Sequence, residues 1–103
     1  MPLGVFGPVF GSGVTPLNST QTTGPISGAT VFPAPANALG FLLQTDSTNA
    51  TNVRYRIGGS AASASLGHQL EPGRDTGFLP FGSTLQAAVE SGTCLIQLTW
   101  FIK

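Results

Sequence analysis

The chain has 103 residues, 41% of them apolar, and only eight carry a charge, four of each sign, so the formal net charge at pH 7 is zero. A typical soluble domain has about a quarter of its residues charged, and a nucleic-acid-binding protein normally presents a basic patch, so we expect no nucleic-acid partner. This length supports one domain with one modest core, and the single cysteine, Cys94, excludes an intrachain disulfide.

We also expect no secretory signal and no membrane partner. The N-terminus lacks a basic region, and Pro and Gly at positions 2, 4, 7 and 8 interrupt any apolar helix. No run approaches the roughly 20 apolar residues of a membrane span. These features predict synthesis in a reducing cytosol.

Residues 1–36 differ in character from the rest of the chain. They hold 12 of the 22 glycines and prolines and no charged residue. Gly and Pro disfavour a regular helix or a central strand, yet the segment is too apolar for a typical disordered tail. We therefore predict an extended N-terminal arm that becomes ordered on another surface through Phe6, Phe10 and Phe32, the candidate partner-binding anchors. That surface is the protein's own body, a sister subunit or a different protein.

The remaining residues, 37–103, are predicted to form the folded body. The apolar run 38–45 predicts a strand, and the polar cluster 46–52 predicts the loop that follows it. Residues 53–57 alternate strictly between apolar residues and arginine, which predicts a strand with Arg54 and Arg56 pointing outward. These two arginines are further candidates for polar contacts with a partner.

Four more segments complete the predicted body. A short extended segment over 67–70 precedes a turn at 71–73, and residues 76–81 predict an edge strand because Pro80 lacks a backbone donor. Residues 84–90 fit either a helix or a strand. We favour the strand, since Ser91-Gly92 would then form a tight hairpin into a last strand over 93–102.

The last strand has one clearly apolar face. Its predicted core-facing residues are Cys94, Ile96, Leu98, Trp100 and Ile102. On the opposite face, Leu95 and Phe101 lie among polar residues and are available to contact another surface, such as a partner. Short strands with Gly/Pro turns and no long helix predict an all-β fold, namely an antiparallel β-sandwich of jelly-roll or Ig-like type that carries the N-terminal arm.

The sequence carries no signal for catalysis, a cofactor or a metal. His68 is the only histidine, and a buried structural role is favoured for Cys94. His68, Glu71, Arg74 and Asp75 cluster around a turn and could form a small acid–base site. We favour a polar turn with one exposed ion pair, because such pairs are common and weak.

Two alternatives for the other polar and aromatic residues stay open at this point. Arg54 and Arg56 could bind phosphate or carbohydrate, or could simply block pairing at a sheet edge. Trp100 and Tyr55 could stack on a sugar, but both belong to apolar faces and fit core packing better.

Residues 52–102 resemble small head-associated virion proteins of tailed bacteriophages. The resemblance rests on the stretches 52–59 (NVRYRIGG), 67–73 (GHQLEPG) and 91–101 (SGTCLIQLTWF). It implies a compact β-sandwich that decorates the capsid surface, made in the host bacterial cytoplasm, with the major capsid protein as partner and with itself as a homo-oligomer, a dimer or a trimer.

The resulting hypothesis is a cement or decoration protein that stabilises an assembled capsid by contacts across neighbouring major capsid subunits. A ligand that binds only the closed shell stabilises that shell by mass action. The alternatives are a tail, neck or fibre subunit, and a small carbohydrate-binding β-sandwich. An enzyme is the least favoured class.

Overall fold

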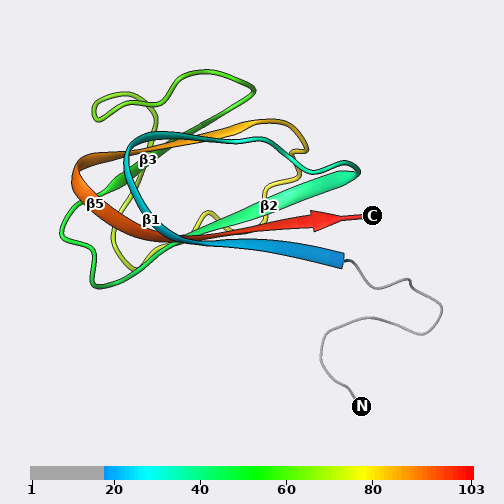
Figure 1. Ribbon diagram of the computed structural model, residues 1–103, viewed down its shortest axis with the longest axis horizontal. Helices are drawn as coiled ribbons and strands as arrows, with labels where there is room; N and C mark the ends of the chain where they lie inside the picture. Colours follow the sequence, from blue (N-terminus) through cyan, green and yellow to red (C-terminus); the bar gives the residue numbers. More distant parts are fainter. Residues whose placement is uncertain (1–17) are drawn as a thin grey trace, which may run out of the picture.

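The computed structural model describes residues 18–103 of the chain, and these residues form an all-β, antiparallel sheet (Figure 1). The five strands are β1 (Asn18–Phe32), β2 (Ala38–Thr45), β3 (Val53–Ile57), β4 (His68–Leu70) and β5 (Leu85–Ile102). Among these residues no helix is long and apolar enough to cross a membrane.

The long strand β5 pairs with three other strands. Its first half pairs with β3, and β3 pairs in turn with the short β4. Its second half pairs with β2. The edge strand β1 runs along the other side of β5 over both halves (Figure 1). Every strand but β4 is therefore bonded directly to β5.

Both β1 and β5 bend at the same place. Ser27 pairs with Thr93 before the bend and Ala29 with Ala88 after it, so one residue of β1, Gly28, faces four residues of β5. Gly28 and Gly92 both have positive φ, 64° and 66°, a backbone conformation that favours glycine because it lacks a Cβ. The bend folds the sheet over its own inner face.

The two halves of the bent sheet enclose one hydrophobic core. The first half contributes residues of β3, β4 and β5, and the second half contributes residues of β1, β2 and β5. The core cluster consists of Ile26, Phe41, Leu43, Val53, Leu70, Leu85, Ala87, Val89, Cys94, Ile96, Leu98 and Trp100. The predicted core face of 93–102 is thus confirmed for four of its residues, whereas Ile102 at the strand end is half-buried.

The predicted hairpin at Ser91-Gly92 is wrong, because 85–90 and 93–102 are two parts of one strand that do not pair with each other. The preferred two-residue hairpin turns need a positive φ at their first central residue. Only Gly92, the second of the pair, has one. This combination bends the chain while β1 stays paired alongside it.

Residues 18–32, within the span predicted as an arm, form an edge strand of the same sheet. Of the three surfaces considered for this segment, the one that Asn18–Phe32 meets is the protein's own body. Phe32 packs, half-buried, against the core cluster. Residues 1–17, with Phe6 and Phe10, lie outside the described residues.

Most of the remaining strand predictions agree with the structure, and one does not. Strands β2 and β3 have the predicted bounds, and 84–90 is extended rather than helical. The predicted edge strand 76–81 is not a continuous strand. Residues 75–79 instead form two isolated bridges to β2, Phe41–Leu79 and Gln44–Asp75, and so cover the open side of β2.

Two leucines of β5 test the assignment of inner and outer faces. Leu98 is fully buried, whereas Leu95 is 45% exposed on the other side of the same strand. We expect Leu98→Ala to lower the free energy of unfolding by about 2–5 kcal/mol, because it leaves a cavity in the core. Leu95→Ala should lower it by less than about 1 kcal/mol. Urea unfolding followed by Trp100 fluorescence measures both, and equal losses would contradict the assignment.

Candidate functional site

The outward-facing side chains of β1, β2 and the second half of β5 form one continuous surface, which we call the outer face. Thr23, Gln97 and Gln44 are partners in register across the three strands and form one row of it. The neighbouring residues on β2 and β5, the fully buried Leu43 and Leu98, point to the core instead. Alternation along paired strands therefore fixes which side chains the outer face presents.

The outer face is uncharged. None of the eight charged residues belongs to β1, β2 or residues 93–102 of β5. Asp46, directly after β2, stands at its rim. A partner that covers this face would have no ionised strand side chain to desolvate, which removes the largest cost of burying a protein surface.

Two aromatic rings meet at one end of the outer face. The rings of Phe78 and Phe101 lie 5.4 Å apart in an edge-to-face arrangement, and Phe78 is 51% exposed. Gly40 lies beneath them, since a Cβ at this position would collide with the Phe78 ring and lie 2.5 Å from the Leu79 carbonyl oxygen. A glycine in β2 thus lets the ring of an exposed aromatic residue approach the backbone of the sheet closely.

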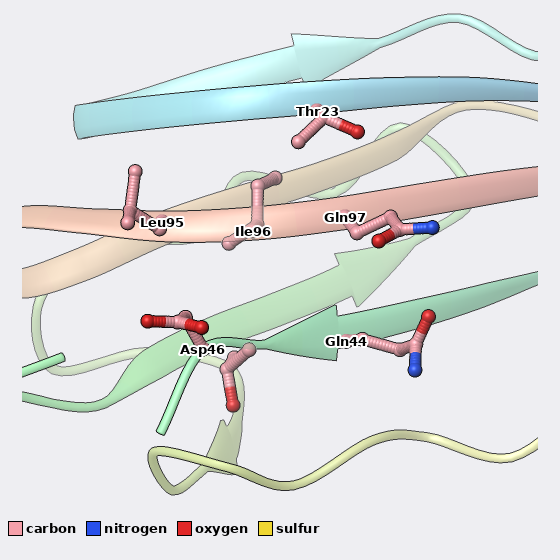
Figure 2. A pocket seen from close by; sticks show the side chains of 7 residues that line it. Thr23, Gln44, Asp46, Leu95, Ile96 and Gln97 are labelled. Carbon is pink, nitrogen blue, oxygen red and sulfur yellow. The ribbon is translucent and has the colours of Figure 1, made fainter. Parts of the chain in front are cut away.

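A shallow depression of about 290 Å³ opens on the same face (Figure 2). Its lining includes Thr23, Gln44, Asp46, Leu95, Ile96 and Gln97. The amide and hydroxyl groups can both donate and accept hydrogen bonds, and Leu95 supplies an apolar contact. This mixture suits another protein's backbone and side chains.

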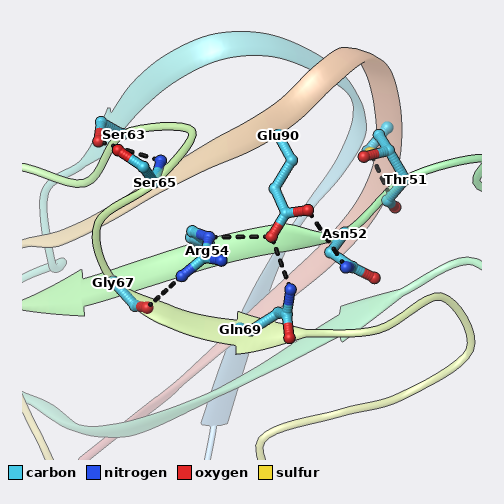
Figure 3. A network of polar contacts seen from close by, with 9 residues as sticks. Thr51, Asn52, Arg54, Ser63, Ser65, Gly67, Gln69 and Glu90 are labelled. Atoms are coloured by element: carbon cyan, nitrogen blue, oxygen red, sulfur yellow. Dashed lines mark hydrogen bonds and ion pairs between the residues drawn. The ribbon is translucent and has the colours of Figure 1, made fainter.

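Arg54 belongs to a polar network on the first half of the sheet, centred on Glu90 (Figure 3). The Arg54 Nε donates to Glu90 Oε2 at 2.9 Å, and Gln69 and Asn52 donate to the same carboxylate at 2.8 and 3.2 Å. Arg54 Nη1 also donates to the Gly67 carbonyl oxygen at 3.2 Å. The network ties β3, β4 and the bend of β5 together, so Arg54 has a structural task within its own chain.

The network sets the protonation of Glu90. The hydrogen bond from Gln69 has the largest effect and lowers the pKa of Glu90. Partial burial raises this pKa, and the contacts of Asn52 and Arg54 lower it again. The net result is a pKa below the ordinary value of 4.5.

The other predicted contact residues are placed as follows. Arg56 Nη1 donates to the Ala61 carbonyl oxygen at 3.2 Å in the loop after β3. Phe32 packs, half-buried, against the core cluster. The structure does not bring Phe32, Arg54 and Arg56 to the outer face, and their predicted role in binding a partner stays a prediction.

The residues weighed for chemistry have structural surroundings. Cys94 is fully buried, and its thiol donates to the Thr51 carbonyl oxygen at 3.5 Å. Arg74 and Glu71 form an exposed ion pair at 3.8 Å, and the ring of His68 lies against Tyr55 of the neighbouring strand. Trp100 is buried against Phe41, so its ring is not available to stack on a sugar.

A comparison with known protein families finds no model that matches this chain, and a comparison with curated proteins finds no match either. The candidate site therefore stands on the geometry of the outer face.

Sequence reasoning missed the row of Thr23, Gln97 and Gln44. It placed Gln97 on the free side of 93–102 but singled out only Leu95 and Phe101 there as contact candidates. The available signal was the absence of charge from three segments that are far apart in the sequence. What the sequence lacked was the register that aligns them.

The network around Glu90 predicts a defined pH dependence of stability. Because the folded pKa of Glu90 lies below its unfolded value, the carboxylate stabilises the fold above pH 4.5, and this contribution is lost as the pH falls through the lowered folded pKa. We expect Glu90→Gln to be less stable than the wild type at neutral pH and equally stable at the acid end. Urea unfolding at several pH values measures this difference.

The matched control is Glu71→Gln, whose carboxylate lies 3.8 Å from the Arg74 guanidinium, with both side chains mostly exposed. It should change stability little at any pH. A Glu90→Gln deficit that persists unchanged into acid would contradict the assigned protonation.

Cys94 provides an independent probe of core opening. Burial raises the pKa of the thiol, and only the thiolate reacts with disulfide reagents. We expect Cys94 to be unreactive toward DTNB at pH 8 in native protein and to react fully in denaturant. Rapid reaction without denaturant would show that the second half of the sheet opens readily.

Proposed function

We propose that this protein is a non-catalytic structural virion protein that binds the assembled phage capsid and stabilises it as a cement or decoration protein. In this proposal it contacts neighbouring major capsid subunits on the capsid surface, after synthesis in the host cytoplasm. The virion setting is suggested by the resemblance of residues 52–102.

The observation that supports binding to protein is the outer face. It joins three uncharged strand segments, exposed apolar groups such as Leu95 and Phe78, and hydrogen-bonding side chains such as Gln97. Interfaces are depleted in charge at their centres and enriched in aromatic residues. We assign the capsid contact to this face, with Phe6 and Phe10 as additional anchors from the segment that precedes β1.

The same proposal extends to architecture and assembly. A single core between the two halves of the bent sheet supports the interpretation as a small β-sandwich, of jelly-roll or Ig-like type. A homo-oligomer, dimer or trimer, would present several outer faces to neighbouring capsid subunits at once and so raise the avidity.

Another virion part, such as a tail, neck or fibre subunit, uses the same kind of face and is the second candidate. The carbohydrate-binding alternative is weaker, because one of its two aromatic residues, Trp100, is buried. Immunogold labelling of intact particles distinguishes the capsid from the tail.

Co-sedimentation with purified capsids tests the proposed contact. Gln97→Glu keeps the size of a central outer-face side chain and adds a charge, which would be buried without a partner. We expect it to weaken capsid binding by at least about tenfold. Ala64→Glu, in the exposed loop after β3, adds the same charge away from the face and should bind like the wild type.

Removal of residues 1–17 tests the additional anchors and leaves β1 complete. If Phe6 and Phe10 contribute, this deletion should also weaken sedimentation with capsids. If wild-type protein does not sediment with capsids, the capsid function is wrong. If it sediments and Gln97→Glu sediments equally well, the assignment to the outer face is wrong.

A further inference from the structure

The long strand β1 has a partner on one side only. It pairs with β5, and no other strand of residues 18–103 pairs with it. Its far side is an open sheet edge, distinct from the outer face, and such an edge carries backbone groups that can pair with another strand.

Hydrogen bonds on β2 determine which residues of β1 point their backbone groups to the open side. Phe41 and Leu79 exchange two backbone bonds of 2.9 Å, so the backbone groups of Phe41 point away from β5. In antiparallel pairs the bonded positions alternate. The backbone groups of the next residue, Leu42, therefore point to β5 and bond to its partner Thr99.

The same alternation continues through β5 into β1. If Thr99 bonds to β2, its neighbours Leu98 and Trp100 bond to β1, through Thr22 and Thr20. The residues between them therefore direct their amide and carbonyl groups to the open edge. These residues are Ser19, Gln21, Thr23, Pro25 and Ser27.

The position of Pro25 agrees with this assignment of backbone groups to the open edge. Proline has no amide hydrogen and is tolerated in sheets where that hydrogen would point away from the ladder. Its position implies that the free edge has complete donor–acceptor pairs at Ser19, Gln21 and Thr23, before the donor is lost at Pro25.

Residues 18–103 cover the other long edge of the sheet but not this one. The open side of β2 is occupied by residues 74–79, whose bonds include Thr76 N–H to the Leu43 carbonyl at 3.0 Å and Thr45 N–H to the Arg74 carbonyl at 2.9 Å. Strand β4 is only three residues long. In contrast, β1 has fifteen residues and none of the charged side chains that usually prevent edge pairing.

We propose that β1 pairs antiparallel with β1 of a second copy of this chain, about a twofold axis at Gln21. In this register Gln21 faces its own copy, and Ser19 faces Thr23 on both sides of the axis. Pro25 lies beyond these pairs, so each of the three edge residues both donates and accepts.

A second copy suits this edge because of its charge. A twofold axis places the strand against its own sequence, so a charged residue near the axis would face a like charge. Residues 18–32 contain none. The pairing would join two sheets into one and would set two outer faces side by side. It does not depend on the proposed capsid function.

Sedimentation equilibrium of the full chain without capsids tests the proposal. We expect the wild type to be a dimer. Thr23→Pro removes one edge donor from each copy, and Gln21→Lys places two like charges at the axis. Each should raise the dimer dissociation constant at least tenfold. The control Thr23→Ala keeps the backbone donor and should remain a dimer.

Both substituted residues point their backbone groups away from β5, so we expect each variant to fold. Thermal unfolding of each variant verifies this. Removal of residues 1–17 should leave the dimer intact. The proposal is overturned by a monomeric or trimeric wild type, by loss of the dimer on that deletion, or by folded Thr23→Pro and Gln21→Lys variants that remain dimeric.

Discussion

Backbone pairing of β5 on both of its sides is the interaction on which the rest of the structure depends. Through it, segments at opposite ends of the sequence are held in one sheet, and each half of the strand contributes side chains to the same core. The bend must keep these bonds while turning the strand. Glycines at positions 28 and 92 make this possible, because both adopt a conformation that side chains disfavour.

The bend is also where polar contacts concentrate. The amide of Glu90 donates to the Asn52 carbonyl at 3.0 Å, and its carboxylate collects donors from β3, β4 and the loop before β3. At the other side of the bend, Asn49 donates to and accepts from the backbone of Leu95, at 2.9 and 2.7 Å. Side chains of the loop between β2 and β3 thus form hydrogen bonds to β5 on both sides of its bend.

Local sequence pattern predicted those parts of the fold in which local and tertiary preferences agree. Alternation in 53–57 and 93–102 identified two strands and most of the core face of 93–102, because alternation of this kind is sufficient to predict a half-buried strand. Ser91-Gly92 misled because a two-residue turn and a bend use the same residues, and only pairing with β1 distinguishes them. The strand over 18–32 was hidden by its Gly and Pro content, which an edge strand tolerates. The outer face could not be predicted, because it exists only through the register of three distant segments.

The few charged residues of the chain are unevenly distributed over the structure. Arg54 and Glu90 neutralise each other at the bend, and Arg74 and Glu71 do so in the turn after β4. The strand segments of the outer face, namely β1, β2 and residues 93–102 of β5, carry none. In a protein that is neutral as a whole, the strand segments of the outer face are therefore free of charge, which suits them to lie against another surface.

The pairing of Asn18 with Ile102 places the start of the described chain beside its C-terminus. The loop after β3 lies instead near the beginning of β5, where the Gly58 amide donates to the Thr84 carbonyl at 3.0 Å (Figure 1). A fluorescent protein or an epitope fused to Lys103 would therefore lie beside the first residue of β1. The same insertion at the exposed turn of Ala64 and Ser65 would leave the paired ends of β1 and β5 uncovered, which makes that turn the preferred insertion site.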